Sequence, residues 1–211
     1  MTGTLPALPI GGVGIREGGS VKDEGSSGRG QIVSLVERAC AGSDAAYGSL
    51  MRHYWPGVYR VVLRMVRAED VAQDVAQQAF IRGWESIERL REASRFRSWI
   101  YAIALNAARN ELRKRARPRH VDVDGLPLQA PEFTAEDGQN EHGRWLREAV
   151  QELPERQRSV VSLRIEGELS FREIADAIGG TEGAARVNFC HALKTLKARL
   201  GERKAQEESH E

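Results

Sequence analysis

The chain contains only two cysteines in 211 residues, Cys40 and Cys190, and they lie far apart in the sequence. Two distant cysteines form neither a disulfide framework nor a zinc-binding spacing, so both are predicted to be ordinary intracellular thiols. The sequence also lacks an apolar run near the ~20 residues that a membrane span requires. Its first residues show no charged segment followed by an apolar one, which a secretory signal would need. These absences predict a cytoplasmic protein that does not insert into a membrane.

Residue sets that carry enzymatic chemistry are missing as well. The five histidines are scattered along the chain: His53, His120, His142, His191 and His210. No nucleophile and base stand at a characteristic spacing. The glycines near the N-terminus follow no predicted strand and open no predicted helix, as those of a phosphate-binding loop would. We therefore expect no catalytic residues, no metal site and no cofactor.

Net charge is nearly absent too, because 31 basic residues face 30 acidic ones and the formal net charge is +1. This total gives no argument for a nucleic-acid partner, but the charges are distributed unevenly. Between residues 91 and 120 nine basic residues stand against two acidic ones. Residues 118–143 hold six acids against one arginine. The positive balance of the first segment is therefore local, and the acidic segment that follows offsets it.

Apolar residues recur at steps of three and four, the period of helices, and no long segment alternates as a strand would, so the fold is predicted to be all-α. Two small helical domains, residues 31–117 and 144–200, are separated by residues 118–143. Those residues contain three prolines and three glycines, which predict a flexible linker. Residues 1–30 carry nine glycines without apolar periodicity and are predicted to be a disordered extension. Residues 201–211 are predicted to be a polar, frayed tail.

In the first domain, Ser43 is predicted to cap a helix whose apolar residues follow at helical spacing. Pro56 lies inside this pattern and should kink the helix or restart it, because proline lacks an amide hydrogen. Two further helices are predicted over residues 69–84 and 97–117.

The helix over residues 97–117 combines an aromatic side chain with arginines and amides on one face. Six residues fall within ~60° of Asn106 on the helical wheel, Asn106 included: Trp99, Asn106, Arg109, Asn110, Arg113 and Arg117. Such a face suits melted DNA, because stacking can contribute ~1–3 kcal/mol per base and arginines neutralise phosphates. Arg95 and Arg97 at the start of the helix complete the candidate set. The alternative is a solvated basic face with Trp99 packed under a neighbouring loop.

The helix over residues 69–84 presents a different outer face. Its polar stripe consists of Asp70, Asp74, Gln77, Gln78 and Arg82. Acidic groups repel DNA, so this stripe is predicted to face water or a protein.

The second domain contains a capping signal, a short helix, a glycine turn and a longer helix. Ser170 and Glu173 fit a reciprocal cap, Gly179-Gly180 breaks the first helix, and Thr181 can cap the next one. The predicted inward face of that helix is Ala185, Phe189, Ala192, Leu193, Leu196 and Leu200. This is the layout of a helix-turn-helix, whose second helix enters the major groove of DNA.

The outward face of that second helix suits base reading. Val187 is out of place on a solvated face but can touch a thymine methyl, Asn188 can read adenine, and Arg186 can contact guanine or a phosphate. The candidate duplex-binding residues are Arg172, Arg186, Val187, Asn188, His191 and Lys194. A plain helical hairpin with a polar outer face remains an alternative for this segment.

Together these motifs resemble a known family. Residues 69–84 (EDVAQDVAQQAFIRGW) resemble region 2.2 of the extracytoplasmic-function (ECF) sigma factors, subunits of bacterial RNA polymerase. Residues 95–106 (RFRSWIYAIALN) resemble their regions 2.3 and 2.4. Residues 153–158 (LPERQR), together with residues 171–200, resemble their region 4. The motifs stand in the family's order, with a linker between them.

The resemblance implies a role for each surface. The stripe on residues 69–84 would bind the coiled coil of the polymerase β′ subunit, and residues 99–117 would recognise and open the −10 element of promoter DNA. Asn106 would lie near the pocket for an extruded base. The second domain would read the −35 element as duplex, with its other side on the polymerase β flap. An anti-sigma factor would hold such a protein inactive.

The sequence departs from the family at two of these surfaces. Gln78 stands where an acid is usual, and Arg186-Val187-Asn188 replaces the commoner Lys/Arg-Ser-Arg. The rival interpretation is a helix-turn-helix regulator with an N-terminal sensory domain that binds duplex DNA without polymerase. The basic helix that carries Trp99 argues against this rival, because a duplex-binding regulator has no use for a strand-stacking surface.

Overall fold

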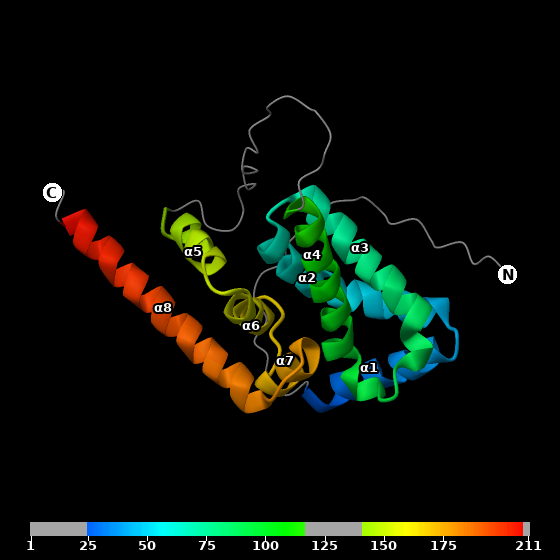
Figure 1. Ribbon diagram of the computed structural model, residues 1–211. Helices are drawn as coiled ribbons and strands as arrows, with labels where there is room; N and C mark the ends of the chain where they lie inside the picture. Colours follow the sequence, from blue (N-terminus) through cyan, green and yellow to red (C-terminus); the bar gives the residue numbers. More distant parts are fainter. Residues whose placement is uncertain (1–24, 117–140, 209–211) are drawn as a thin grey trace, which may run out of the picture.

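The computed structural model of the chain describes residues 25–116 and 141–208. The first helical domain consists of α1 (Gly25–Cys40), α2 (Asp44–Val66), α3 (Glu69–Ser86), the 3₁₀ turns η1 (Ile87–Arg89) and η2 (Ala93–Arg95), and α4 (Phe96–Ala116). The second consists of α5 (Glu141–Gln151), α6 (Glu155–Ile165), α7 (Phe171–Ile178) and α8 (Glu182–Glu208). These described residues contain no strand, which confirms the predicted all-α fold (Figure 1).

The predicted helix starts are formed by side-chain caps. The Ser43 hydroxyl accepts a hydrogen bond from the amide of Ala46 at the start of α2. Ser170 and Glu173 form both halves of a capping box on α7, and the Thr181 hydroxyl accepts from the amide of Ala184 in α8. Each cap satisfies an amide that has no partner within the helix, so the local sequence sets where these helices begin.

The helix α2 passes through Pro56 without interruption, so of the two predicted outcomes, a kink or a restart, the restart is excluded. A proline inside a helix costs ~3 kcal/mol because one backbone hydrogen bond is lost. Apolar residues on both sides of Pro56 pack into the core, with Tyr54 9% and Val58 0% exposed. This burial offsets the local cost and keeps the helix continuous.

Three predicted boundaries were also wrong. The helix α1 begins at Gly25 rather than at residue 31, so residues 25–30 are helical and not part of a disordered extension. The helix α5 begins at Glu141, within the predicted linker, and α8 continues past Gly201 to Glu208, into the predicted frayed tail. Each residue added to a formed helix gains a backbone hydrogen bond without the cost of starting a new helix. Weak helix formers next to a packed helical segment can therefore become helical too. The rest of the predicted extension and linker lies outside the described residues.

One apolar core extends through both helical domains. In the first domain it includes Leu50 and Phe96, which are completely buried. It continues into the second domain through Leu163, Leu169 and Ile174, which are buried to the same degree. The two predicted domains therefore pack against each other, chiefly through α4 and α7 (Figure 1).

A second, smaller core holds α5, α6 and α8 together through Ala149, Leu153, Val161, Ala192 and Leu196. The predicted inward face of α8 is confirmed at three positions: Ala185, Ala192 and Leu196. Leu193 was wrongly assigned to this face, because 39% of it is exposed. Leu193 lies about 100° around the helix from the buried Ala192, and the neighbouring helices do not cover the surface of α8 that far round.

Tyr101 of α4 connects the two domains sterically. Its hydroxyl lies so close to Gly57 of α2 that a Cβ atom there would overlap it, and its ring would be 3.1 Å from a Cβ at Gly167. The residue is 2% exposed. Two positions without side chains, one in each domain, thus make room for this ring.

We expect Gly57→Ala to destabilise the protein by about 1–3 kcal/mol, because the added methyl group would displace the buried Tyr101 ring. Thermal unfolding followed by circular dichroism measures this effect as a lower midpoint. Gly48→Ala in the same helix is the matched control, since a Cβ there meets only the Arg52 Nη1 atom at 3.6 Å. That change should be neutral or stabilising, because alanine is the better helix former. Equal midpoints for both variants would contradict the steric role of Gly57.

Candidate nucleic-acid interface

The helix α4 turns its small apolar residues inward and its polar stripe outward, as predicted. Three residues of its inward side are completely buried: Ile100, Ala104 and Ala108. Three residues of its outward side are exposed: Asn106, Asn110 and Arg113. An Arg113 guanidinium nitrogen lies 3.2 Å from the Asn110 side-chain oxygen and donates to it. Arg117, the last residue of the predicted stripe, lies outside the described residues.

Trp99 lies at the border between the core and this stripe. The side chain is half-buried, and its ring centroid is 5.8 Å from that of the fully buried Phe96, at an angle of 49° between the planes. The indole is therefore held by the core on one side and remains partly open to solvent. A supported, partly exposed aromatic ring is what stacking on an unpaired base requires.

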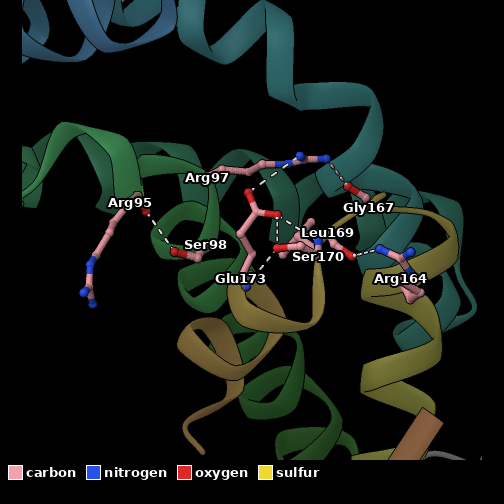
Figure 2. A network of polar contacts seen from close by, with 8 residues as sticks. All are labelled: Arg95, Arg97, Ser98, Arg164, Gly167, Leu169, Ser170 and Glu173. Atoms are coloured by element: carbon pink, nitrogen blue, oxygen red, sulfur yellow. Dashed lines mark hydrogen bonds and ion pairs between the residues drawn. The ribbon is translucent and has the colours of Figure 1, made fainter. Parts of the chain in front are cut away.

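The structure places three of the predicted DNA-binding arginines against the second domain. Arg97 donates to the carbonyl oxygen of Gly167 at 2.7 Å and lies 3.7 Å from a Glu173 carboxylate oxygen (Figure 2). Arg109 is more tightly paired, with its Nε atom 2.7 Å from a carboxylate oxygen of Glu155.

Arg95 is the third of these residues. It pairs with Glu92 at 2.8 Å within its own domain and lies 4.0 Å from Asp176 of α7. The sequence analysis missed all of these contacts between domains, because partners 46 or more residues apart leave no trace in a local pattern.

Further polar contacts reinforce the same interface. The Nε atom of Arg64 on α2 lies 2.8 Å from a Glu166 carboxylate oxygen, and these side chains are only 27% and 16% exposed. The side-chain amide of Gln151 donates to the Arg64 carbonyl. Burial raises the pKa of the Tyr101 hydroxyl to about 12, against the opposing effect of the nearby Arg97 and Arg60 charges. Tyr101 is therefore neutral at neutral pH, and the two arginines beside it lie close to carboxylates of the second domain, Arg97 to Glu173 and Arg60 to Glu166.

The helix-turn-helix forms as predicted. Gly179 and Gly180 both have positive φ angles, 72° and 152°, which glycine adopts at little cost in the turn between α7 and α8. On the outward face of α8, Val187 is 52% exposed, and His191 and Lys194 are exposed as well. Among the candidate duplex-binding residues, Arg172 of α7 is also exposed.

Two of the candidate reading residues already have partners. The Asn188 side-chain nitrogen donates to the carbonyl of Ala184 at 2.8 Å, so this half-buried amide is less free than predicted. Arg186 pairs with Glu182 at 3.0 Å, and its guanidinium carbon lies 4.9 Å from the centroid of the Phe171 ring. A guanidinium held over an aromatic face is preorganised, because fewer of its rotamers remain to be fixed on binding.

The sequence analysis did not single out Phe171 and Arg164. The Arg164 guanidinium carbon is 5.0 Å from the same Phe171 ring, and Arg164 donates to the carbonyl of Leu169 at 2.8 Å (Figure 2). One ring therefore contacts two arginines of the second domain. The three residues lie on three different helices, α6, α7 and α8, so the wheel projection of one helix cannot find the group.

The polar stripe of α3 is open to solvent. All five of its predicted members are exposed: Asp70, Asp74, Gln77, Gln78 and Arg82. The opposite side packs into the core through Ala72 and Ala79, both 0% exposed. The packing of the two domains thus covers part of the α4 surface but leaves the α3 stripe accessible.

No group of three or more His, Cys, Asp or Glu side chains among residues 25–116 and 141–208 is arranged to hold a metal ion. Within the same residues, no helix combines the length and the apolar character that a membrane crossing demands.

Comparison with known proteins matches both domains separately. The Sigma-70 region 2 family model matches residues 50–118, and the Sigma-70, region 4 model matches residues 143–196. The RNA polymerase sigma-H factor of Pseudomonas aeruginosa is 30% identical over 182 residues, which cover 81% of the chain and 94% of that protein. The ECF RNA polymerase sigma-E factor of Escherichia coli K12 is 31% identical over 173 residues, which cover 77% of the chain and 90% of that protein.

Solved structures show the same fold. The structure of CnrH in complex with the cytosolic domain of CnrY superimposes with a TM-score of 0.62 at 20% identity, over 82% of the chain and 98% of CnrH. The sigma factor RpoE of Bartonella quintana, solved in complex with the anti-sigma factor NepR, gives a TM-score of 0.57 at 18% identity, over 74% of the chain and 96% of RpoE. At these identities the similarity concerns the fold.

Proposed function

The chain belongs to the ECF family of RNA polymerase sigma factors, and from this premise we propose that it brings core polymerase to promoters, reads their −10 and −35 elements and helps to melt the DNA. The observation that carries the proposal is the pairing of two different DNA-binding surfaces in one chain. One is the α4 stripe, with a supported indole among arginines and amides. The other is a helix-turn-helix with an outward-facing second helix. A protein that opens DNA needs the first, and one that reads duplex needs the second.

We assign the −10 strand to the α4 stripe. Trp99 would stack on an unpaired base, and the exposed amide of Asn106 would read a base edge beside it. The arginines would contact phosphates along the strand: Arg95, Arg97, Arg109, Arg113 and Arg117. Asn110, which accepts from Arg113, would hold that guanidinium in place.

We assign the −35 duplex to the outward face of α8. Val187 would contact an apolar base edge, and His191 and Lys194 would approach the groove wall. Arg186 would enter the groove already aligned by Phe171, with Arg172 near the backbone. Asn188 would have to release the Ala184 carbonyl before it could read a base.

We assign polymerase binding to the exposed stripe of α3, which would contact the β′ coiled coil, while the second domain would contact the β flap. The protein would act in the cytoplasm on nucleoid DNA. It would add promoter recognition to the polymerase, which carries out the chemistry of RNA synthesis. Its relative from Bartonella quintana was solved with an anti-sigma factor, and we propose that this chain is regulated by a protein of the same kind.

Each DNA-binding domain would bind weakly alone and gain from being joined. Because α5 begins at Glu141, the predicted linker is shorter, and a random chain of about 23 residues would average roughly 24–29 Å and reach roughly 76–83 Å when stretched. Both domains could then engage one promoter on the polymerase, where the first contact raises the effective concentration for the second.

In vitro transcription tests the proposal directly. With core RNA polymerase from its source organism, the protein should direct initiation at defined promoters, found by sequencing the transcripts from a genomic template library. Core polymerase alone is the control. Specific duplex binding by the free protein, together with no initiation in the presence of core polymerase, would instead support the duplex-binding regulator.

Trp99→Ala should reduce strand opening about tenfold or more, because a lost stacking contact is worth ~1–3 kcal/mol. Asn106→Ala should reduce it as well, because its hydrogen bond to a base edge is lost. Permanganate reactivity of thymines near the −10 element measures this opening, and core polymerase binding should stay unchanged. Arg115→Ala is the control, since Arg115 lies on the other side of α4 and pairs with Glu111. Normal melting by a double Trp99→Ala and Asn106→Ala variant would remove both residues from the strand-binding role.

Asp74→Ala should weaken binding to core polymerase by several-fold while leaving the fold intact, because Asp74 is exposed at the centre of the α3 stripe. A competition assay between the variant and the wild-type protein for core polymerase measures the affinity. Glu37→Ala is the control, as an exposed acid on α1, outside the α3 stripe. If the two variants compete equally well, the α3 stripe does not bind polymerase through Asp74.

A further inference from the structure

A cavity of about 300 Å³ lies where α2, α4 and the turn between α6 and α7 meet. Its wall contains two tyrosines and two arginines of the first domain and two glutamates of the second: Tyr54, Tyr101, Arg60, Arg97, Glu166 and Glu168. We propose that this cavity binds a free α-amino acid, whose carboxylate would contact the first domain and whose ammonium group would contact the second. The site does not depend on the proposed function, because a small volume with a charged wall suits a small polar ligand whatever else the chain binds.

The two tyrosines bring hydroxyl groups without partners to this cavity. Tyr54 is 9% and Tyr101 is 2% exposed, yet neither hydroxyl has a hydrogen-bond partner within the part of the chain that the structure describes. Neither oxygen is completely enclosed by protein atoms, so each is open to the cavity that its residue lines. Buried tyrosine hydroxyls usually have a partner. The cavity therefore offers its occupant two groups that can each donate a hydrogen bond.

The two arginines make the side of the cavity formed by α2 and α4 cationic. The Nε atom of Arg60 reaches a Glu166 carboxylate oxygen only at 4.0 Å, and the Arg60 side chain is 51% exposed, so this pair is loose. Arg97 extends across the cavity wall and donates to the carbonyl of Gly167 at 2.7 Å (Figure 2). Guanidinium groups bind carboxylates through short, charge-assisted hydrogen bonds. A ligand carboxylate at this place would accept from a guanidinium and from the tyrosine hydroxyls together.

The turn between α6 and α7 supplies the negative charge. Glu166 already pairs with Arg64 at 2.8 Å. Glu168 is exposed and has no ion-pair partner among residues 25–116 and 141–208. Its φ angle is 54°, in the left-handed region that residues with a side chain seldom adopt, and such strained backbone is found at ligand-binding segments. A ligand ammonium group would give this carboxylate the partner that it lacks.

The balance of charges selects the class of ligand. Arg60 and Arg97 offset Glu166 and Glu168, so a simple anion would meet carboxylates and a simple amine would meet guanidinium groups. Both signs of charge also act at one place: burial is the main cause of the raised pKa of Tyr101, the two arginines oppose this rise and Glu168 adds to it. Charges so close together match a zwitterion whose two groups are close together, as they are in an α-amino acid.

Thermal unfolding of the free, full-length protein tests the site, because a ligand that binds only the folded chain raises the unfolding midpoint. The probes are the common L-amino acids, each added alone. Acetate, methylamine and inorganic phosphate are the control compounds, because each carries only one sign of charge. At about a hundredfold excess over its dissociation constant, the amino acid that binds should raise the midpoint by about 5–10 °C, and the control compounds should not. Isothermal titration calorimetry then measures the affinity of that amino acid.

The combination of Tyr54→Phe with Tyr101→Phe tests the hydroxyl groups. Both rings stay in place and no hydrogen bond within the protein is lost, so the unfolding midpoint without ligand should stay near that of the wild-type protein. The affinity for the amino acid should fall about tenfold or more, because hydrogen bonds to a charged group are lost. Tyr59→Phe is the matched control, since Tyr59 is a half-buried tyrosine of α2 that does not line the cavity.

The two charges are tested separately. Arg60→Gln and Glu168→Gln should each weaken binding about tenfold, because each removes one partner of the zwitterion and keeps the size of the side chain. Arg52→Gln is the control for the first change, as an exposed arginine of α2 that donates to Ser49. Glu202→Gln at an exposed site on α8 is the control for the second.

Three results would overturn the proposal. If no amino acid raises the midpoint, the cavity holds only water. An equal rise with acetate or inorganic phosphate would show a site for simple anions instead of one for a zwitterion. Unchanged affinity in the double tyrosine variant would place the bound amino acid elsewhere on the protein.

Discussion

The structure depends on the position of α4 between the rest of its own domain and α7 of the second domain. The helix packs against α2 and α3 on one side and against α7 on another. Small residues such as Ala104 and Ala108, both completely buried, allow this close approach. Tyr101 extends from the same helix into space left by glycines of both domains. Every surface assigned a role lies on α4 or is oriented by the elements packed around it.

Part of the positive charge on and just before α4 is balanced within the molecule. Arginines in and just before α4 are matched by carboxylates that lie far away in the sequence but next to them in space. A chain with a strong excess of positive charge would attract nucleic acid at every encounter. Here the basic surface is balanced by part of the same molecule.

In the helix-turn-helix, a residue that packs between two helices also orients a side chain of the proposed DNA-reading face. Phe171 begins α7, packs edge-on against Phe189 of α8, and contacts the guanidinium groups of Arg164 and Arg186. The same ring therefore helps to fix the angle between the two helices and the position of an arginine on the reading helix. Because the ring already orients the Arg186 side chain, less side-chain conformational entropy is lost on binding. The contact with Phe171 also orients the Arg186 side chain in the absence of DNA.

The sequence by itself determined the helices, their caps and the face that each helix turns inward, because these follow from interactions within one or two turns of the chain. Ser43, Ser170 and Thr181 cap where the pattern predicts, and the α3 stripe faces solvent as expected. The continuation of α8 past Gly201 was missed, because the extension of a helix already formed outweighs local propensity. Only the tertiary structure decided that Arg97 and Arg109 face carboxylates rather than solvent. Those partners come from another domain, and no periodicity along a single helix records a contact between two separate ones.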